Sequence, residues 1–135
     1  MDLKCNKNCH SQYRLEYHLV LAKKYRKPCI TPEMLQYLKE ECSRLLALSG
    51  TELLEVNGEA DHIHLLISAP PQVCLANVIN SLKSSTSRLV RKKYADHLAS
   101  FYWKPYFWSR SYLILSSGGA PIEVIRRYIQ EQGKN

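Results

Sequence analysis

The segment DHIHLL, residues 61–66, places two histidines one residue apart in an otherwise apolar run. Successive side chains of a β-strand point to opposite faces, so a strand here would put His62 and His64 on one face and Ile63 on the other. Adjacent imidazoles are typical of divalent metal sites, and the spacing therefore predicts two metal ligands. The alternative is a polar pair on the open face of a sheet. We expect Asp61 to hold one imidazole in a single tautomer by hydrogen bonding, with direct metal ligation as the alternative.

A nucleophile for such a site is predicted in the last helix of the chain. Apolar residues recur at helical spacing from about residue 120 to residue 132, and Tyr128 and Gln132, which are four residues apart, border that stripe. A protonated phenol, with a pKa of about 10, is a poor nucleophile. Beside a phosphodiester polarised by a bound cation, Tyr128 could attack phosphorus and form a phosphotyrosine. The amide oxygen of Gln132 could complete the coordination of the metal.

The hydrophobic pattern of the whole chain predicts the elements that position these residues. Thr31 is expected to cap a helix that starts at Pro32 and stops before Gly50. The pair Asn57-Gly58 indicates either a hairpin turn or a bulge in a longer strand pairing. The predicted strands are residues 13–21, 51–60, 61–69 and 111–116, and the other predicted helices are 73–94 and 120–132. The order β-α-β-β-α-β-α fits an α+β, ferredoxin-like (split βαβ) antiparallel sheet with helices on one face.

Length and composition indicate one domain over residues 1–135, preceded by an N-terminal arm at 1–11. No apolar segment is long enough to span a membrane and no secretory signal is evident. With five cysteines, an odd number, reduced thiols in the cytosol are expected. Cys5, Cys9 and His10 could belong to a zinc site, but the usual second ligand pair is missing and a partly ordered arm is the favoured interpretation.

A formal net charge of +7 suits a polyanionic partner, although many basic proteins bind nothing specific. Two groups of basic residues could contact phosphates, or could simply be solvated. The first group lies in a loop after the first strand and the second on the helix 73–94: Lys23, Lys24, Arg26 and Lys27, then Lys83, Arg88, Arg91 and Lys92. Trp103, Phe107 and Trp108 could stack on bases, but core packing is expected for at least two of them.

Four stretches of the chain together resemble one known family. They are His62-Ile63-His64, YHLVLAKKYRKP (17–28), FWSRSYLILSSGGAP (107–121) and IEVIRRYIQEQ (122–132). They are similar to the single-tyrosine HUH transposases, small enzymes of bacterial and archaeal insertion sequences that move as single-stranded DNA. The resemblance extends from about Tyr13 to Gln132, and Cys5, Cys9 and His10 have no counterpart in it.

The resemblance implies a specific activity. Such proteins have a ferredoxin-like core and form homodimers in which the histidines of one subunit meet the tyrosine helix of the other. They recognise DNA hairpins near the ends of the element, act as endonucleases that leave a 5′-phosphotyrosine and a free 3′-OH, and then rejoin strands. Carried over to this sequence, Tyr128 would be the nucleophile, and His62, His64 and Gln132 would bind Mg²⁺ or Mn²⁺. A cytoplasmic, nucleoid-associated protein is expected.

Two other functions are compatible with the sequence. One is a domesticated relative that nicks and joins palindromic repeats in the chromosome with the same chemistry. The other is a non-catalytic nucleic-acid-binding module, because a ferredoxin-like sheet is also the platform of many RNA-binding domains. Simple binding does not need His62, His64, Tyr128 and Gln132 together.

Overall fold

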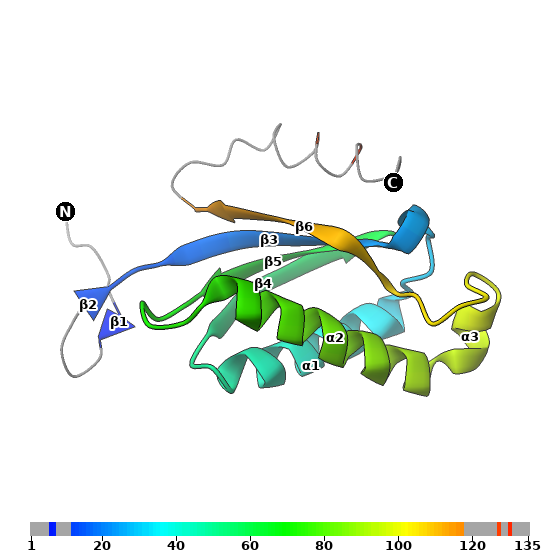
Figure 1. The fold of residues 1–135 in the computed structure, drawn as a ribbon, viewed down its shortest axis with the longest axis horizontal. Helices are drawn as coiled ribbons and strands as arrows, with labels where there is room; N and C mark the ends of the chain where they lie inside the picture. The colour runs from blue at the N-terminus through cyan, green and yellow to red at the C-terminus, as the bar shows by residue number, and fades with distance from the viewer. Residues whose placement is uncertain (1–5, 8–11, 118–126, 128–129, 131–135) are drawn as a thin grey trace.

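A computed structural model describes residues 6–7, 12–117, 127 and 130 of the chain. Its main sheet has four antiparallel strands in the order β4-β5-β3-β6, and helices α1 and α2 cover one face (Figure 1). The elements are β1 Asn6–Lys7, β2 Gln12–Tyr13, β3 Glu16–Lys23, η1 Lys24–Arg26, α1 Pro32–Ala47, β4 Glu52–Glu59, β5 His62–Ser68, α2 Leu75–Lys93, α3 Ala95–Ala99 and β6 Trp108–Ser116. This arrangement is the predicted α+β, split βαβ ferredoxin-like fold.

Helix α1 starts and ends where local signals place its boundaries. Thr31 caps it, since the Thr31 hydroxyl accepts a hydrogen bond from the Met34 amide at 3.1 Å, and Pro32 occupies the first helical turn. Beyond its end, Gly50 has a φ of 76°, a left-handed conformation that glycine adopts without steric cost. The helix buries one stripe against the sheet: Met34, Leu38, Cys42 and Leu46.

The Asn57-Gly58 pair does not form the turn of the β4–β5 hairpin. It lies inside β4, where Asn57 pairs with His64 and Gly58 with Ile63, so the strand pairing extends past it. The register irregularity of this hairpin lies instead between Leu53 and Glu55. Gly58 is required by close packing, because a Cβ there would lie 2.9 Å from the His62 carbonyl oxygen.

The core lies between the sheet and the two long helices. Its sheet side consists of Leu19 and Leu21 from β3 and Ile63, Leu65 and Ile67 from β5, all buried. The strand predicted at residues 13–21 differs in the structure in its start and in its burial, because an alternating strand with one apolar face was expected to be buried on that face alone. The strand begins at Glu16, and Val20 and Ala22 on its other face are fully buried as well. Strand β3 is paired on both edges, with β5 on one side and β6 on the other.

From α2 to β6 the fold follows the prediction with one addition, and β6 begins at Trp108 instead of the predicted residue 111. Helix α2 matches the expected 73–94 closely, and the short helix α3 follows it without having been predicted. Phe107 and Trp108 are buried as expected, and the Trp108 indole donates to the Thr86 hydroxyl at 2.9 Å. Trp103, in contrast, is 84% exposed.

Two predicted segments fall wholly or partly outside the described residues: the helix 120–132 and the N-terminal arm 1–11. Of the arm, Asn6–Lys7 pairs with Gln12–Tyr13, and the Asn6 amide donates to the Ser68 hydroxyl at 3.0 Å. Among the helices that the structure describes, none combines the length and apolarity that crossing a bilayer requires.

Candidate functional site

Strand β5 presents His62 and His64 on the face of the sheet opposite to the helices. Burial alternates along the strand, because both histidines are partly exposed whereas Ile63 and Leu65 are fully buried in the core. Within the sheet, His62 pairs with Glu59 on β4, and His64 pairs with Asn57 on the same strand. The predicted sharing of one face by the two imidazoles is therefore correct.

A third imidazole, which the sequence analysis missed, completes this cluster. His18 of β3 has its Nδ1 2.8 Å from His64 Nε2, and the two rings stack with centroids 5.0 Å apart. Because His18 alternates with core residue Leu19, it had to lie on the histidine face once β3 paired with β5. That pairing brings together residues 46 positions apart in the chain. The sequence therefore shows a histidine in the first strand but not the strand register that places it beside His64.

The His18 contact has a consequence for metal binding at His64. Burial, followed by the nearby His18, lowers the pKa of His64 below its ordinary 6.5, which favours the neutral ring that a metal requires. One of the two histidines donates in the 2.8 Å contact, and His64 uses its Nε2 there. A metal ion at His64 must therefore bind Nδ1 or displace His18 from Nε2.

His62 is held by a chain of hydrogen bonds that leads to Arg26. Its Nδ1 lies 2.8 Å from Asp61 Oδ1, and Asp61 Oδ2 accepts bonds of 2.9 Å and 2.6 Å from Nε and Nη2 of Arg26. Partial burial opposes ionisation of Asp61, but the hydrogen bonds from His62 and Arg26 outweigh it and lower the pKa of Asp61 below 3.8. An ionised carboxylate can only accept, so His62 Nδ1 carries the proton and its Nε2 is the nitrogen that can bind a metal.

This is the contact predicted for Asp61. Arg26, predicted as a possible phosphate contact, pairs with the Asp61 carboxylate. The Arg26 guanidinium is directed at Asp61 from a strained turn, in which Tyr25 has a φ of 56° and Arg26 a φ of 50°. Left-handed conformations of non-glycine residues cost about 1–3 kcal/mol each and persist where the surroundings enforce them. Here the Phe107 carbonyl accepts from the Lys24 amide at 2.8 Å, and the Tyr102 hydroxyl donates to the Lys24 carbonyl at 2.6 Å.

A carboxylate from the neighbouring strand also reaches this corner of the site. Glu59, Asp61 and His62 each offer a ligand atom, and these atoms lie within 4.8 Å of one another. Oxygen and imidazole ligands together suit Mg²⁺ or Mn²⁺. Glu59 was not singled out from the sequence, because its proximity depends on its pairing with His62 across the hairpin. The predicted nucleophile Tyr128 and the predicted ligand Gln132 lie outside the described residues.

Lys23 does not occupy the basic surface loop in which it was predicted. It ends strand β3 with no exposed surface, and its Nζ lies 2.7 Å from the centroid of the Phe107 ring. Within the described part of the chain, this Nζ has no hydrogen-bond partner. Burial lowers the pKa of Lys23 to about 6, and the nearby Cys29 offsets only part of this effect. Lys23 cannot contact DNA phosphates in this position because aromatic side chains enclose its amine.

The other predicted DNA-contacting residues lie at or near the surface. Lys27, Arg88 and Lys92 are exposed, and the last two line an open pocket of about 400 Å³ together with Arg44. Other basic side chains of the two groups already contact rings, a carbonyl or a hydroxyl of the protein itself. Lys24 lies against two tyrosine rings, the Lys83 amine donates to the Arg110 carbonyl at 2.8 Å, and the Arg91 Nε donates to the Ser87 hydroxyl at 3.1 Å.

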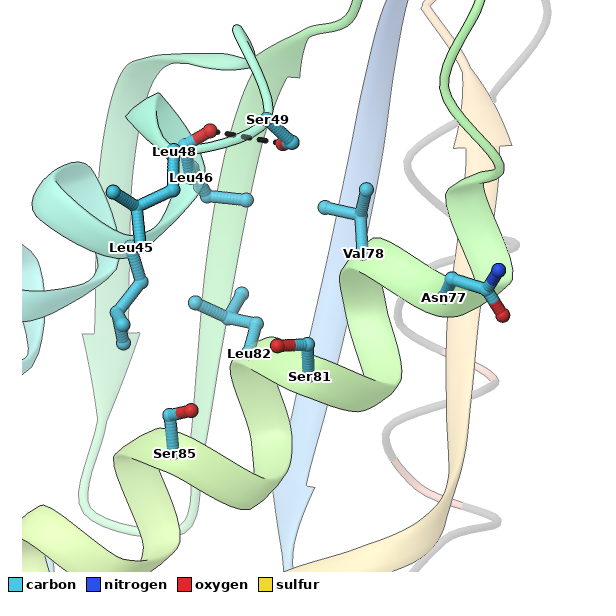
Figure 2. A pocket seen from close by; sticks show the side chains of 9 residues that line it. All are labelled: Leu45, Leu46, Leu48, Ser49, Asn77, Val78, Ser81, Leu82 and Ser85. Atoms are coloured by element: carbon cyan, nitrogen blue, oxygen red, sulfur yellow. Dashed lines mark hydrogen bonds between the residues drawn. The ribbon is translucent and has the colours of Figure 1, made fainter.

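The pocket drawn in Figure 2 lies next to the one that Arg88 and Lys92 line, between the end of α1 and the first half of α2. It has a volume of about 330 Å³. Its walls are Leu45, Leu46, Leu48, Ser49, Asn77, Val78, Ser81, Leu82 and Ser85. This lining contains no acid, base or metal ligand, and the helices that form it cover the sheet face opposite to His62 and His64. Within the described residues, the candidate metal ligands therefore lie on the histidine face and not at this pocket.

Comparisons with known proteins agree on one family. The family model described as "Transposase IS200 like" matches residues 11–132. The chain is 32% identical over 120 residues to the ISDra2 transposase TnpA of Deinococcus radiodurans, an alignment that covers 89% of this chain and 85% of the relative. It is 28% identical over 123 residues to the transposase for insertion sequence element IS200 of Salmonella typhimurium, with 91% and 80% covered.

Solved structures give the same result. A crystal structure from Deinococcus radiodurans, provisionally assigned as a transposase, superposes with a TM-score of 0.85 at 30% identity and covers 94% of this chain and 97% of its own. A REP-associated tyrosine transposase bound to a REP hairpin superposes with a TM-score of 0.55 at 9% identity, covering 91% of this chain and 68% of its own. The second likeness concerns the fold alone.

Proposed function

Because the chain belongs to the IS200-like transposase family, we propose that it cleaves and rejoins single-stranded DNA at insertion-sequence ends through a 5′-phosphotyrosine. The observation that carries the proposal is the orientation of His62. Asp61, which is itself bound by Arg26, accepts from His62 Nδ1, so the Nε2 of His62 is available on the face that also bears His64. A carboxylate behind a metal-binding histidine is a recurrent arrangement that fixes the ring and raises its basicity.

His62 and His64, with Gln132 as the third ligand, would hold Mg²⁺ or Mn²⁺. Glu59 is a further oxygen donor near His62. A divalent ion at this position supplies Lewis-acid stabilisation of the charge that develops on a phosphodiester. The donor set fits such an ion because it combines imidazole nitrogen with amide or carboxylate oxygen.

Tyr128 would act as the nucleophile. Its phenol loses a proton, the phenolate oxygen forms a bond to phosphorus, and the bond from phosphorus to the 3′ oxygen breaks, so that the leaving oxygen takes up a proton as a 3′-OH. Attack of a 3′-OH on a second phosphotyrosine reverses these steps and releases the tyrosine. Each exchange replaces one phosphodiester with another, so no external energy source is required.

The proposed partners are DNA hairpins near the ends of the element and a second copy of this chain. Support for hairpin binding comes from the transposase of the same fold that is bound to a REP hairpin. The formal charge of +7 and the exposed Lys27, Arg88 and Lys92 suit contacts to phosphates. In a homodimer, the tyrosine helix of one subunit would serve the histidines of the other. A cytoplasmic, nucleoid-associated location follows from this role.

A covalent-trapping experiment tests the proposal. The protein is mixed with labelled single-stranded DNA that carries the palindrome-flanked end of its element, with Mn²⁺ or with EDTA, and resolved on a denaturing gel. We expect an adduct with Mn²⁺ only, lost in Tyr128→Phe and kept in Tyr37→Phe, which changes a tyrosine of α1 on the helix side. An adduct in Tyr128→Phe would overturn the assignment of the nucleophile. Hairpin binding without any adduct would support the non-catalytic binding module instead.

A further inference from the structure

The turn that positions Arg26 also exposes an aromatic ring. Tyr25 is 51% exposed and is one of five large hydrophobic side chains of the described region that are exposed. Its left-handed backbone, with a φ of 56°, is one that glycine or asparagine would adopt at lower cost. Placing Arg26 against Asp61 therefore does not explain a tyrosine at this position. The side chain itself must account for the residue type.

The surroundings of the Tyr25 ring are aromatic and basic. Tyr25 meets Tyr106 edge to face with centroids 5.9 Å apart, and Tyr106 in turn meets Tyr102 at 6.2 Å. The Lys24 amine lies 5.0 Å from the centre of the Tyr25 ring and 5.4 Å from that of Tyr106. A rigid, partly exposed ring with a cation beside it matches the requirements of a nucleobase attached to a phosphate, since the base stacks on the ring and the cation attracts the phosphate.

The turn that carries the Tyr25 ring is bonded to the candidate metal site. Arg26, the next residue in the chain, binds Asp61, and Asp61 binds His62. The Lys23 amide also donates to the Asp61 carbonyl at 2.9 Å, so two contacts fasten the turn to the start of β5. The Asp61 carboxylate that contacts this turn is paired with Arg26 at 2.6 Å, so its negative charge is balanced without the neighbouring Lys24.

We propose that Tyr25, supported by Tyr106 and Lys24, is a stacking site for an unpaired base of single-stranded DNA next to the scissile phosphate. The inference rests on the proposed function and deepens it. Stacking one flanking base on a ring that is fixed to the His62 hydrogen-bond chain would hold the phosphodiester at the metal ligands. The site selects unpaired bases without selecting their sequence, because every base has a π-face.

The test measures binding in EDTA, so that neither metal nor cleavage contributes. Fluorescence anisotropy compares a short oligodeoxythymidylate with an abasic strand of the same length and charge. We expect Tyr25→Gly to weaken binding of the thymidylate about tenfold and to leave binding of the abasic strand unchanged. Tyr25→Phe should retain the wild-type ratio. Glycine tolerates the left-handed backbone, so the unfolding temperature of Tyr25→Gly should not fall below that of the wild type.

Trp103→Ala is the matched control. Trp103 is an exposed aromatic residue whose ring also has a lysine beside it, with the Lys104 amine 4.6 Å from its centre, but it lies outside the turn. The control should leave the ratio of the two affinities at the wild-type value. The stacking site is overturned if Tyr25→Gly leaves the ratio of thymidylate to abasic affinity unchanged. It is also overturned if Trp103→Ala lowers that ratio equally.

Failure of this inference and failure of the proposed function give different results. If the wild type forms the covalent adduct but Tyr25→Gly binds both strands as the wild type does, only the stacking site is wrong. If Tyr25→Gly lowers the ratio of thymidylate to abasic affinity but the wild type forms no adduct with Mn²⁺, the stacking site is supported and the transposase chemistry is wrong.

Discussion

Replacement of the buried Lys23 by methionine should stabilise the protein strongly at neutral pH. The pKa of this lysine is about 6 in the folded chain against an ordinary value of 10.5, because burial disfavours its charged form. At pH 7 the unfolded chain carries this proton and the folded chain has mostly released it. Releasing it across 3.5 pH units costs about 5 kcal/mol at 1.36 kcal/mol per unit. Methionine has a similar length and no charge, so Lys23→Met should raise the free energy of unfolding by about 2 to 5 kcal/mol after repacking.

The pH dependence identifies the cause of this effect. Between about pH 6 and pH 10.5 the unfolded chain binds more protons at Lys23 than the folded chain, so wild-type stability should rise with pH across this window. The advantage of Lys23→Met should therefore shrink as the pH approaches 10. Urea unfolding of both proteins at several pH values measures it. The reasoning is refuted if Lys23→Met destabilises the protein at pH 7, or if its advantage is the same at pH 7 and pH 10.

An exposed lysine of the same segment provides the control. Lys27→Met should leave the free energy of unfolding within about 0.5 kcal/mol of the wild type, as surface substitutions usually do. Its effect should appear in DNA binding. Loss of one phosphate contact reduces the slope of the logarithm of the binding constant against the logarithm of the salt concentration by about one. Lys23→Met should leave that slope unchanged. The two variants thus separate a buried amine from a surface cation.

Two further predictions concern the histidine face. Asp61→Asn removes the ionised acceptor behind His62 and should weaken Mn²⁺ binding by about 10- to 100-fold in isothermal titration calorimetry; unchanged affinity would mean that Asp61 does not orient the ligand. His18→Phe removes a neighbour that lowers the pKa of His64, so that pKa should rise toward 6.5 in an NMR titration of the metal-free protein, while burial keeps it below that value; a fall in the pKa would contradict the electrostatic argument.

Local sequence patterns were sufficient for the order of the four main strands and of α1 and α2, and for part of the site. Strand alternation placed His62 and His64 on one face, and capping chemistry placed the start of α1 at Thr31 and Pro32. The contact between Asp61 and His62 was also predictable, because the two residues are adjacent in the chain. Each of these features depends on residues within one turn of helix or a few strand positions of each other.

The remaining features depend on contacts between residues far apart in the chain. His18 reaches His64 only through the pairing of β3 with β5, Glu59 reaches His62 only across the hairpin, and Arg26 reaches Asp61 only because a strained turn directs it there. The burial of Lys23 likewise requires Phe107, which follows it by more than eighty residues. Backbone periodicity is set by neighbouring residues, and it determined which side chains share a face. Register and burial are set by segments that meet only in the folded chain, so tertiary structure decided which groups touch and which lysine loses contact with water.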